Sequence, residues 1–189
     1  MLNTFVVYVE NKPGVLTRVA SLFRRRAFNI DSLTVGRTEK PEVSRMTIVV
    51  DADHDQAMRV EANLYKLVNV LFVENITAKA AISRDLAMIK VSATHDARSH
   101  VLELANVFRA RVVDLAPDSL TIEITGGEDK IDGLLEVLRP YGVLEMVRTG
   151  IVAMRRGKSE VTNASVGAEN GVQSVPETVA PDDNVSYSV

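Results

Sequence analysis

The chain has 189 residues, of which 46% are hydrophobic, so it can build one large core or two small ones. Its formal net charge of −3 argues against nucleic acid as the main partner, because phosphate binding needs a basic excess. The sequence has no cysteine, no secretory signal pattern and no apolar run of membrane-spanning length. We therefore expect a cytoplasmic protein that binds neither nucleic acid nor a membrane.

The first 78 residues alternate between strand and helix periodicity. Strands are expected at residues 4–9, 30–36, 45–50 and 70–76. A first helix is expected at residues 14–26, and a second begins after Asp51 or Asp53. One face of this second helix is expected to carry Ala57, Val60, Leu64, Leu67 and Val68. The order β-α-β-β-α-β predicts a ferredoxin-like module.

The first strand, residues 4–9, has apolar residues at both its odd and its even positions, so both of its faces are apolar. The helices of this module can cover only one face of its sheet. The other face, or an edge, must therefore meet another surface. We infer an oligomer, most simply a two-fold homodimer.

The same order of elements recurs after a link at residues 79–85. Strands are expected at residues 86–91, 111–115, 120–125 and 142–154, the last with an interruption at residues 148–150. Helices are expected at residues 96–109 and 129–139. The predicted fold class is therefore α+β, with two ferredoxin-like domains at residues 1–78 and 86–157. Residues 158–189 are rich in small and polar residues and predict a flexible C-terminal tail.

Sequence patterns for catalysis and metal binding are largely missing. There is no phosphate-binding G-x-x-x-x-G-K-[ST] loop and no nucleophile elbow. His95 and His100 have the wrong spacing to share one helix face, so a metal site there would need remote carboxylates. We expect no catalytic residue and no metal site on this chain.

The segment around Pro13-Gly14 is better suited to ligand binding. The amides of residues 14–16 begin a helix and are unpaired within it, so they can hold a carboxylate. Gly14 allows that group to approach the backbone closely. Asn11 and Asn29 lie at opposite ends of this helix, so they can meet on one small ligand only across a two-fold interface. Their carbonyl oxygens would accept hydrogen bonds from an ammonium group.

Three apolar residues, Val15, Leu16 and Ile30, would leave room for a small apolar side chain on that ligand. A purely structural interpretation stays open, because Pro-Gly is an ordinary helix start and Asn an ordinary helix end. Spacing alone does not decide between the two interpretations.

Four blocks of residues in the first module resemble a known family. They are Asn11-x-Pro-Gly-Val-Leu, Phe28-Asn-Ile-Asp-Ser-Leu-Thr-Val, Ser44-Arg-Met-Thr-Ile and Leu64-x-Lys-Leu-Val-Asn-Val-Leu. Further matches follow at Phe108-Arg-Ala-Arg and Arg148-Thr-Gly-Ile-Val. Over roughly residues 1–157 the chain resembles the small regulatory subunit of acetolactate (acetohydroxyacid) synthase, and its N-terminal module resembles an ACT domain.

The resemblance implies a non-catalytic subunit that binds the catalytic (large) subunit, raises its activity and confers feedback inhibition by a branched-chain amino acid, usually valine. It implies an effector site between paired ACT domains, at the positions of Asn11, Gly14, Val15, Leu16, Asn29 and Ile30. Thiamine diphosphate, magnesium and FAD would belong to the catalytic subunit, with no cofactor on this chain.

Two rival interpretations remain at this stage. ACT modules serve many proteins, so the chain could be a free-standing regulator that responds to an amino acid, although it lacks a helix-turn-helix segment. The second rival interpretation is that the chain is a stand-alone enzyme.

Overall fold

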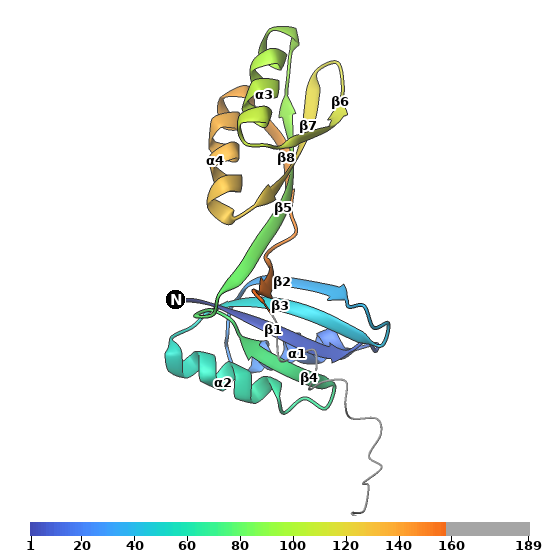
Figure 1. The fold of residues 1–189 in the computed structure, drawn as a ribbon, viewed down its shortest axis with the longest axis vertical. Helices are drawn as coiled ribbons and strands as arrows, with labels where there is room; N and C mark the ends of the chain where they lie inside the picture. Colours follow the sequence, from blue (N-terminus) through green and yellow to red (C-terminus); the bar gives the residue numbers. More distant parts are fainter. Residues whose placement is uncertain (158–189) are drawn as a thin grey trace, which may run out of the picture. The chain divides into compact units, whose positions relative to one another are not determined.

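The computed structural model describes residues 1–157, and within them the first module has the predicted order of elements. Its elements are β1 (Leu2–Glu10), α1 (Val15–Arg25), β2 (Ile30–Arg37), β3 (Val43–Asp51), α2 (His54–Leu64) and β4 (Val70–Asn75). The strands form one antiparallel sheet in the order β2-β3-β1-β4 (Figure 1). This is the ferredoxin-like topology, as predicted.

The second module repeats this topology. Its elements are β5 (Ala81–Ser92), α3 (His95–Val107), β6 (Arg111–Leu115), β7 (Ser119–Gly126), α4 (Glu128–Leu138), a 3-10 turn (Arg139–Tyr141) and β8 (Val143–Arg148). Its sheet has the order β6-β7-β5-β8. The α+β prediction with two ferredoxin-like modules is therefore confirmed.

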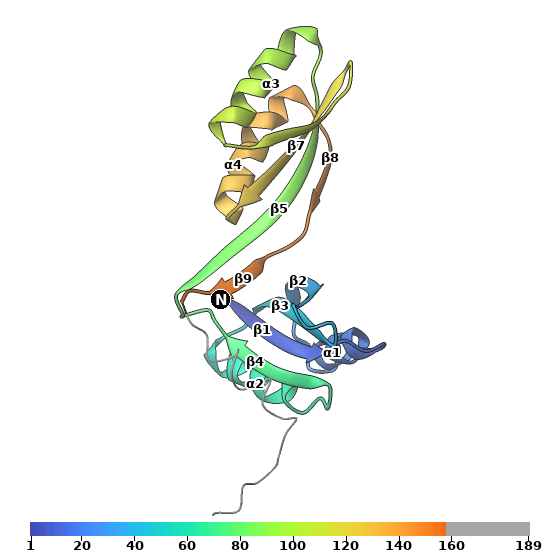
Figure 2. The same cartoon turned by 45° about the vertical axis from the view of Figure 1, so that its right-hand side comes forward.

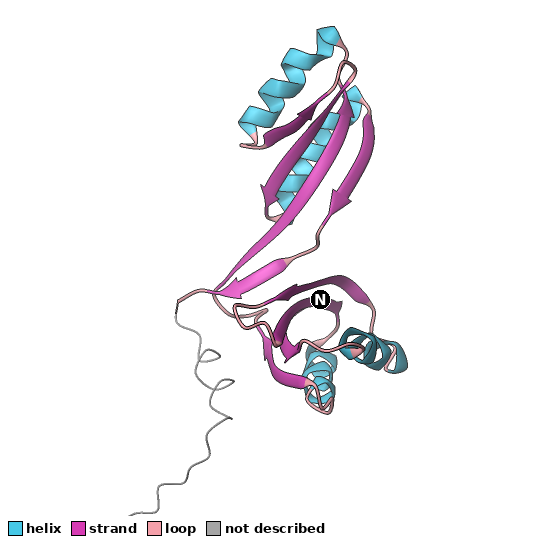
Figure 3. Ribbon diagram, turned by 90° about the vertical axis from the view of Figure 1, so that its right-hand side faces the viewer, coloured by secondary structure: helices cyan, strands magenta, loops and turns pink. Residues whose placement is uncertain are grey.

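Each module has its own hydrophobic core, because its two helices lie on one face of its sheet (Figure 3). In the first module, Val19 and Phe23 of α1 pack with Phe5 of β1, and all three are almost completely buried. In the second module, Ile131 of α4 packs with Ile89 of β5 in the same way. Most residues of the apolar stripes that predicted the helices are thus core residues.

Strand β5 starts earlier than the sequence predicted. Residues 81–85 were expected in a link, but they form the first part of β5 and pair with a further strand, β9 (Val152–Arg155). The later part of β5 pairs with β8 (Figure 2). The predicted interruption of the last strand is present, because β8 ends at Arg148 and β9 begins at Val152. The predicted tail, residues 158–189, lies outside the described residues.

The outer face of β1 is partly covered by β9 of the same chain. Val6 is only 3% exposed and packs in a small cluster with Ile76 and with Ala153 of β9. The Arg45 side chain donates a hydrogen bond to the carbonyl oxygen of Ala153 and lies over the Tyr8 ring. Part of the apolar face therefore needs no partner chain, and the homodimer remains a prediction.

Helix α2 begins at one of its two predicted caps but ends earlier than predicted. Asp53, not Asp51, is the N-cap, and it forms a reciprocal capping box with Gln56. Asp51 instead pairs with the N-terminal amine. The helix ends at Leu64, and Val68, expected on its buried face, is 92% exposed. None of the helices in residues 1–157 has the length and apolar character needed to cross a membrane.

Candidate functional site

The turn before α1 is open at Gly14. This residue is the N-cap of α1 and has a φ of 81°, a conformation that favours glycine. Among residues 1–157, no heavy atom beyond its two chain neighbours would lie within 4 Å of a Cβ added here. The space next to the backbone is therefore available to a ligand, but a side chain would be strained by the backbone conformation.

The first amides of α1 have spare hydrogen-bonding capacity. The first helical bond runs from the Arg18 N–H to the Gly14 carbonyl oxygen at 3.0 Å. The Val15 N–H makes a long bond of 3.4 Å to the Lys12 carbonyl oxygen. Within residues 1–157, no acceptor is hydrogen-bonded to the N–H groups of Leu16 and Thr17. These two donors, with the positive end of the helix dipole, can hold a carboxylate.

Asn11 is held beside this turn by the loop between β2 and β3. Its backbone N–H donates to the Glu42 carbonyl oxygen at 2.7 Å, and its Nδ2 donates to the Pro41 carbonyl oxygen at 2.8 Å. The side chain is exposed, and its Oδ1 has no donor among the described residues. This oxygen can accept a hydrogen bond from an ammonium group.

Asn29 lies beyond the other end of α1, immediately before β2. Its side chain is exposed, and the neighbouring Ile30 is half-buried. Helix α1 has 11 residues, which corresponds to about 16 Å at the standard rise per residue. Asn11 and Asn29 of one chain are therefore separated by the length of the helix, as the sequence predicted.

The two apolar residues that follow Gly14 have different environments. Val15 is 4% exposed and belongs to the hydrophobic core, so it offers a ligand its backbone rather than its side chain. Leu16 is 44% exposed and offers an apolar side chain at the surface. Of the predicted site residues, Leu16 and the half-buried Ile30 are therefore the two whose side chains can contact an aliphatic group.

Sequence reasoning missed a polar cluster beside the turn. The Glu10 carboxylate accepts hydrogen bonds from the Asn69 amide and from Lys12, the latter at 3.0 Å. Arg18 donates to the side-chain oxygen of Asn69. The hydrogen bonds from Asn69 and then Lys12 hold the pKa of Glu10 below its ordinary value of 4.5. Because residues 10 and 69 are far apart in the sequence, no local pattern indicates this contact.

The histidines considered as metal ligands lie apart from this turn. His95 is fully exposed and lies 3.6 Å from Asp96, its neighbour in the sequence. Residues 1–157 contain no group of three His, Cys, Asp or Glu side chains arranged to hold a metal ion.

The fold and the open turn define a class of protein, namely two-module α+β proteins with an N-terminal ACT domain. The family described as "AHAS small subunit-like ACT domain" matches residues 5–72, and the family described as "Small subunit of acetolactate synthase" matches residues 84–157. The chain belongs to the acetolactate synthase small subunit family.

Individual relatives agree with this assignment. The chain is 50% identical over 160 residues to a probable acetolactate synthase small subunit of Archaeoglobus fulgidus, covering 85% of this chain and 100% of that protein. It is 47% identical over 162 residues to the acetolactate synthase small subunit of Mycobacterium bovis, covering 86% of this chain and 96% of that protein. The crystal structure of the small subunit from Thermotoga maritima superposes with a TM-score of 0.78 at 37% identity, covering 84% and 99% of the two chains.

Proposed function

We propose that this chain is the non-catalytic regulatory subunit of an acetolactate synthase. It binds the catalytic subunit, raises its activity and makes it sensitive to feedback inhibition by a branched-chain amino acid, valine in the first instance. Membership of the small subunit family and the ACT domain support a regulatory role. Thiamine diphosphate, magnesium and FAD are assigned to the catalytic subunit, and the complex to the cytoplasm.

The observation that carries the effector site is the open turn at Gly14. The carboxylate of valine would accept hydrogen bonds from the N–H groups of Leu16 and Thr17. Its ammonium group would donate to the side-chain oxygen Oδ1 of Asn11 in one chain and to Oδ1 of Asn29 in a second chain. Leu16, together with Ile30, would contact the isopropyl group.

Inhibition in this proposal is a shift between two arrangements of the complex. Valine shifts the equilibrium only by the difference between its affinities for the active and the inactive arrangement. Activation, in contrast, requires binding to the catalytic subunit and no effector. The two effects are therefore separable by mutation.

The test is reconstitution with the purified catalytic subunit. Acetolactate formation is measured with and without this chain, and then across a valine titration. We expect the chain to raise the rate and valine to lower it again, with leucine and isoleucine as comparisons. Equal rates with and without the chain would contradict the regulatory role. Activation without inhibition by any of the three amino acids would contradict the feedback role.

A further inference from the structure

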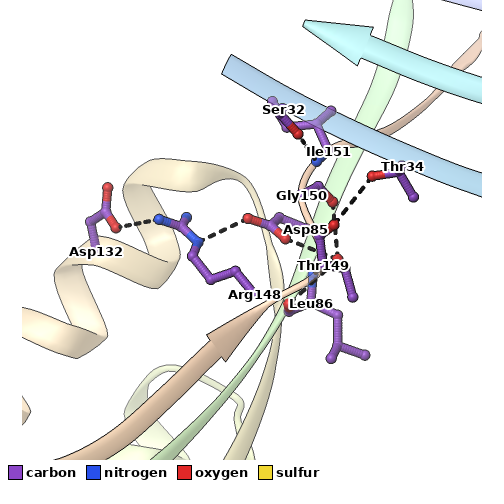
Figure 4. A network of polar contacts seen from close by, with 9 residues as sticks. All are labelled: Ser32, Thr34, Asp85, Leu86, Asp132, Arg148, Thr149, Gly150 and Ile151. Carbon is purple, nitrogen blue, oxygen red and sulfur yellow. Dashed lines mark hydrogen bonds and ion pairs between the residues drawn. The ribbon is translucent and has the colours of Figure 1, made fainter. Parts of the chain in front are cut away.

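Three residues between β8 and β9, which we call the joint (Thr149, Gly150 and Ile151), contact strand β2 of the ACT domain. The Ile151 N–H donates to the hydroxyl oxygen of Ser32 at 3.1 Å. The Thr34 hydroxyl donates to the Thr149 carbonyl oxygen at 3.3 Å. Figure 4 shows both side chains of β2 directed at the joint. The joint is thus hydrogen-bonded to the ACT domain on both sides of Gly150.

Glycine is required at position 150 for two reasons. Its φ is 84°, a conformation that other residues rarely adopt. A Cβ here would lie 2.5 Å from the Ser32 hydroxyl oxygen and 3.2 Å from that of Thr34. The close approach of the joint to β2 therefore depends on the absence of a side chain. This explains the Arg-Thr-Gly block, which the proposed effector site leaves without a role.

The same joint is fixed to the second module by Asp85. This carboxylate is 6% exposed and accepts hydrogen bonds from the Thr149 hydroxyl and from Arg148 Nε, each at 3.0 Å. The Leu86 N–H donates to the Thr149 hydroxyl oxygen at 3.2 Å. Arg148 also bonds Asp132 of α4 at 3.0 Å (Figure 4). Thr149 therefore has partners in both modules.

Strand β2 connects this joint to the proposed effector site, because it begins at Ile30, directly after Asn29, and Ser32 follows two residues later. We propose that the joint carries the state of the effector site into the second module. The route runs through the contacts of Ser32 with Ile151 and of Thr34 with Thr149, and from Thr149 to Asp85, Arg148 and α4. The inference rests on the proposed function for its regulatory meaning. Its physical claim, coupling between β2 and Leu86, does not depend on any ligand.

The ligand-free test compares the wild-type chain with the double variant Ser32→Ala, Thr34→Val by hydrogen exchange of single amides. The informative amide is that of Leu86, which donates to the Thr149 hydroxyl, whereas Ser32 and Thr34 are bonded to Ile151 and Thr149. We expect it to exchange roughly tenfold faster in the variant, since local opening of the joint becomes easier. Ser21→Ala, which removes a hydroxyl from α1, is the matched control and should leave Leu86 unchanged. An unchanged Leu86 rate in the double variant would overturn the proposal.

The functional test uses the complex with the catalytic subunit. The double variant should bind valine and activate the enzyme like the wild type, but the fraction of activity that remains at saturating valine should be several-fold higher than in the wild type. Inhibition to the wild-type extent would overturn the joint as the route, even if Leu86 exchange had changed. If the wild-type complex is not inhibited by any branched-chain amino acid, the proposed function fails, and the exchange experiment still decides whether the joint couples the modules.

Discussion

At the scale of single residues, Gly14 combines two properties that point in the same direction. Its positive φ disfavours other residue types in the turn, and within residues 1–157 no atom beyond its chain neighbours would lie within 4 Å of an added Cβ. The adjacent amides of Leu16 and Thr17 give that space a donor set for an anion.

The neighbouring polar cluster gives a prediction about Glu10. Its pKa is lowered first by the hydrogen bond from Asn69, so Asn69→Ala should raise it towards 4.5. Because the pKa is lowered in the folded state, the ionised carboxylate stabilises the fold above pH 4.5, and this contribution is lost as the pH falls through the folded value. NMR titration of the Glu10 carboxyl carbon measures the shift. Asn106→Ala, an exposed amide on α3, is the control, and an equal Glu10 pKa in both variants would contradict the assignment.

At the scale of elements, apolar periodicity predicted every helix and strand of both modules except where tertiary contacts set an end. Helix α2 stops at Leu64 although apolar residues continue, and the hydroxyl of Tyr65, its C-cap, is hydrogen-bonded to the backbone of Val73 in β4. Strand β5 begins at Ala81 because β9 pairs with it there. β9 is distant from β5 in the sequence and follows a break, so no local pattern reveals this pairing.

The sequence likewise predicts part of the candidate site, and the rest depends on how the module folds. The position of Gly14 at the helix start and of Asn29 beyond its end follows from helix periodicity. Which of Val15 and Leu16 faces the core depends on how the helix lies against the sheet, and the structure buries Val15. The contact between Glu10 and Asn69 depends on the fold of the whole module.

The capping box of α2 gives a prediction at this scale. Asp53→Ala removes a hydrogen bond to the Gln56 N–H and should lower the free energy of unfolding by about 1 kcal/mol. Urea denaturation of the full chain measures this. Asp51→Ala is the matched control, because its ion pair with the N-terminus is exposed on both sides and should contribute less than about 0.5 kcal/mol. An equal loss in the two variants would argue against the cap.

At the scale of the whole molecule, the proposed effector site requires two chains, because α1 separates Asn11 from Asn29. Asn11→Ala and Asn29→Ala each weaken both sites of a homodimer. A mixed dimer of the two variants would have one site without either amide and one intact site. We therefore expect each variant to bind valine weakly alone, and the re-equilibrated mixture to regain tight binding at about half of the sites in its mixed dimers. Calorimetry on the mixture measures this.

Two controls make the mixing experiment decisive. Sedimentation must show that each variant remains a dimer, since a monomeric product would mean that the asparagine is structural. Mixing two batches of the same variant should restore nothing. If the mixture of the two variants binds no more tightly than either alone, the two asparagines do not meet across an interface.

The most direct test of the central claim is calorimetric titration of the purified chain with valine, alongside Gly14→Asp and Gly14→Asn. Both substitutions impose a side chain on the same positive φ, but only aspartate places a negative charge beside the ligand's carboxylate. We predict that valine binds the wild type, that Gly14→Asn retains measurable binding, and that Gly14→Asp loses it. Equal affinities for the aspartate and asparagine variants would contradict a carboxylate-binding effector site at the start of α1.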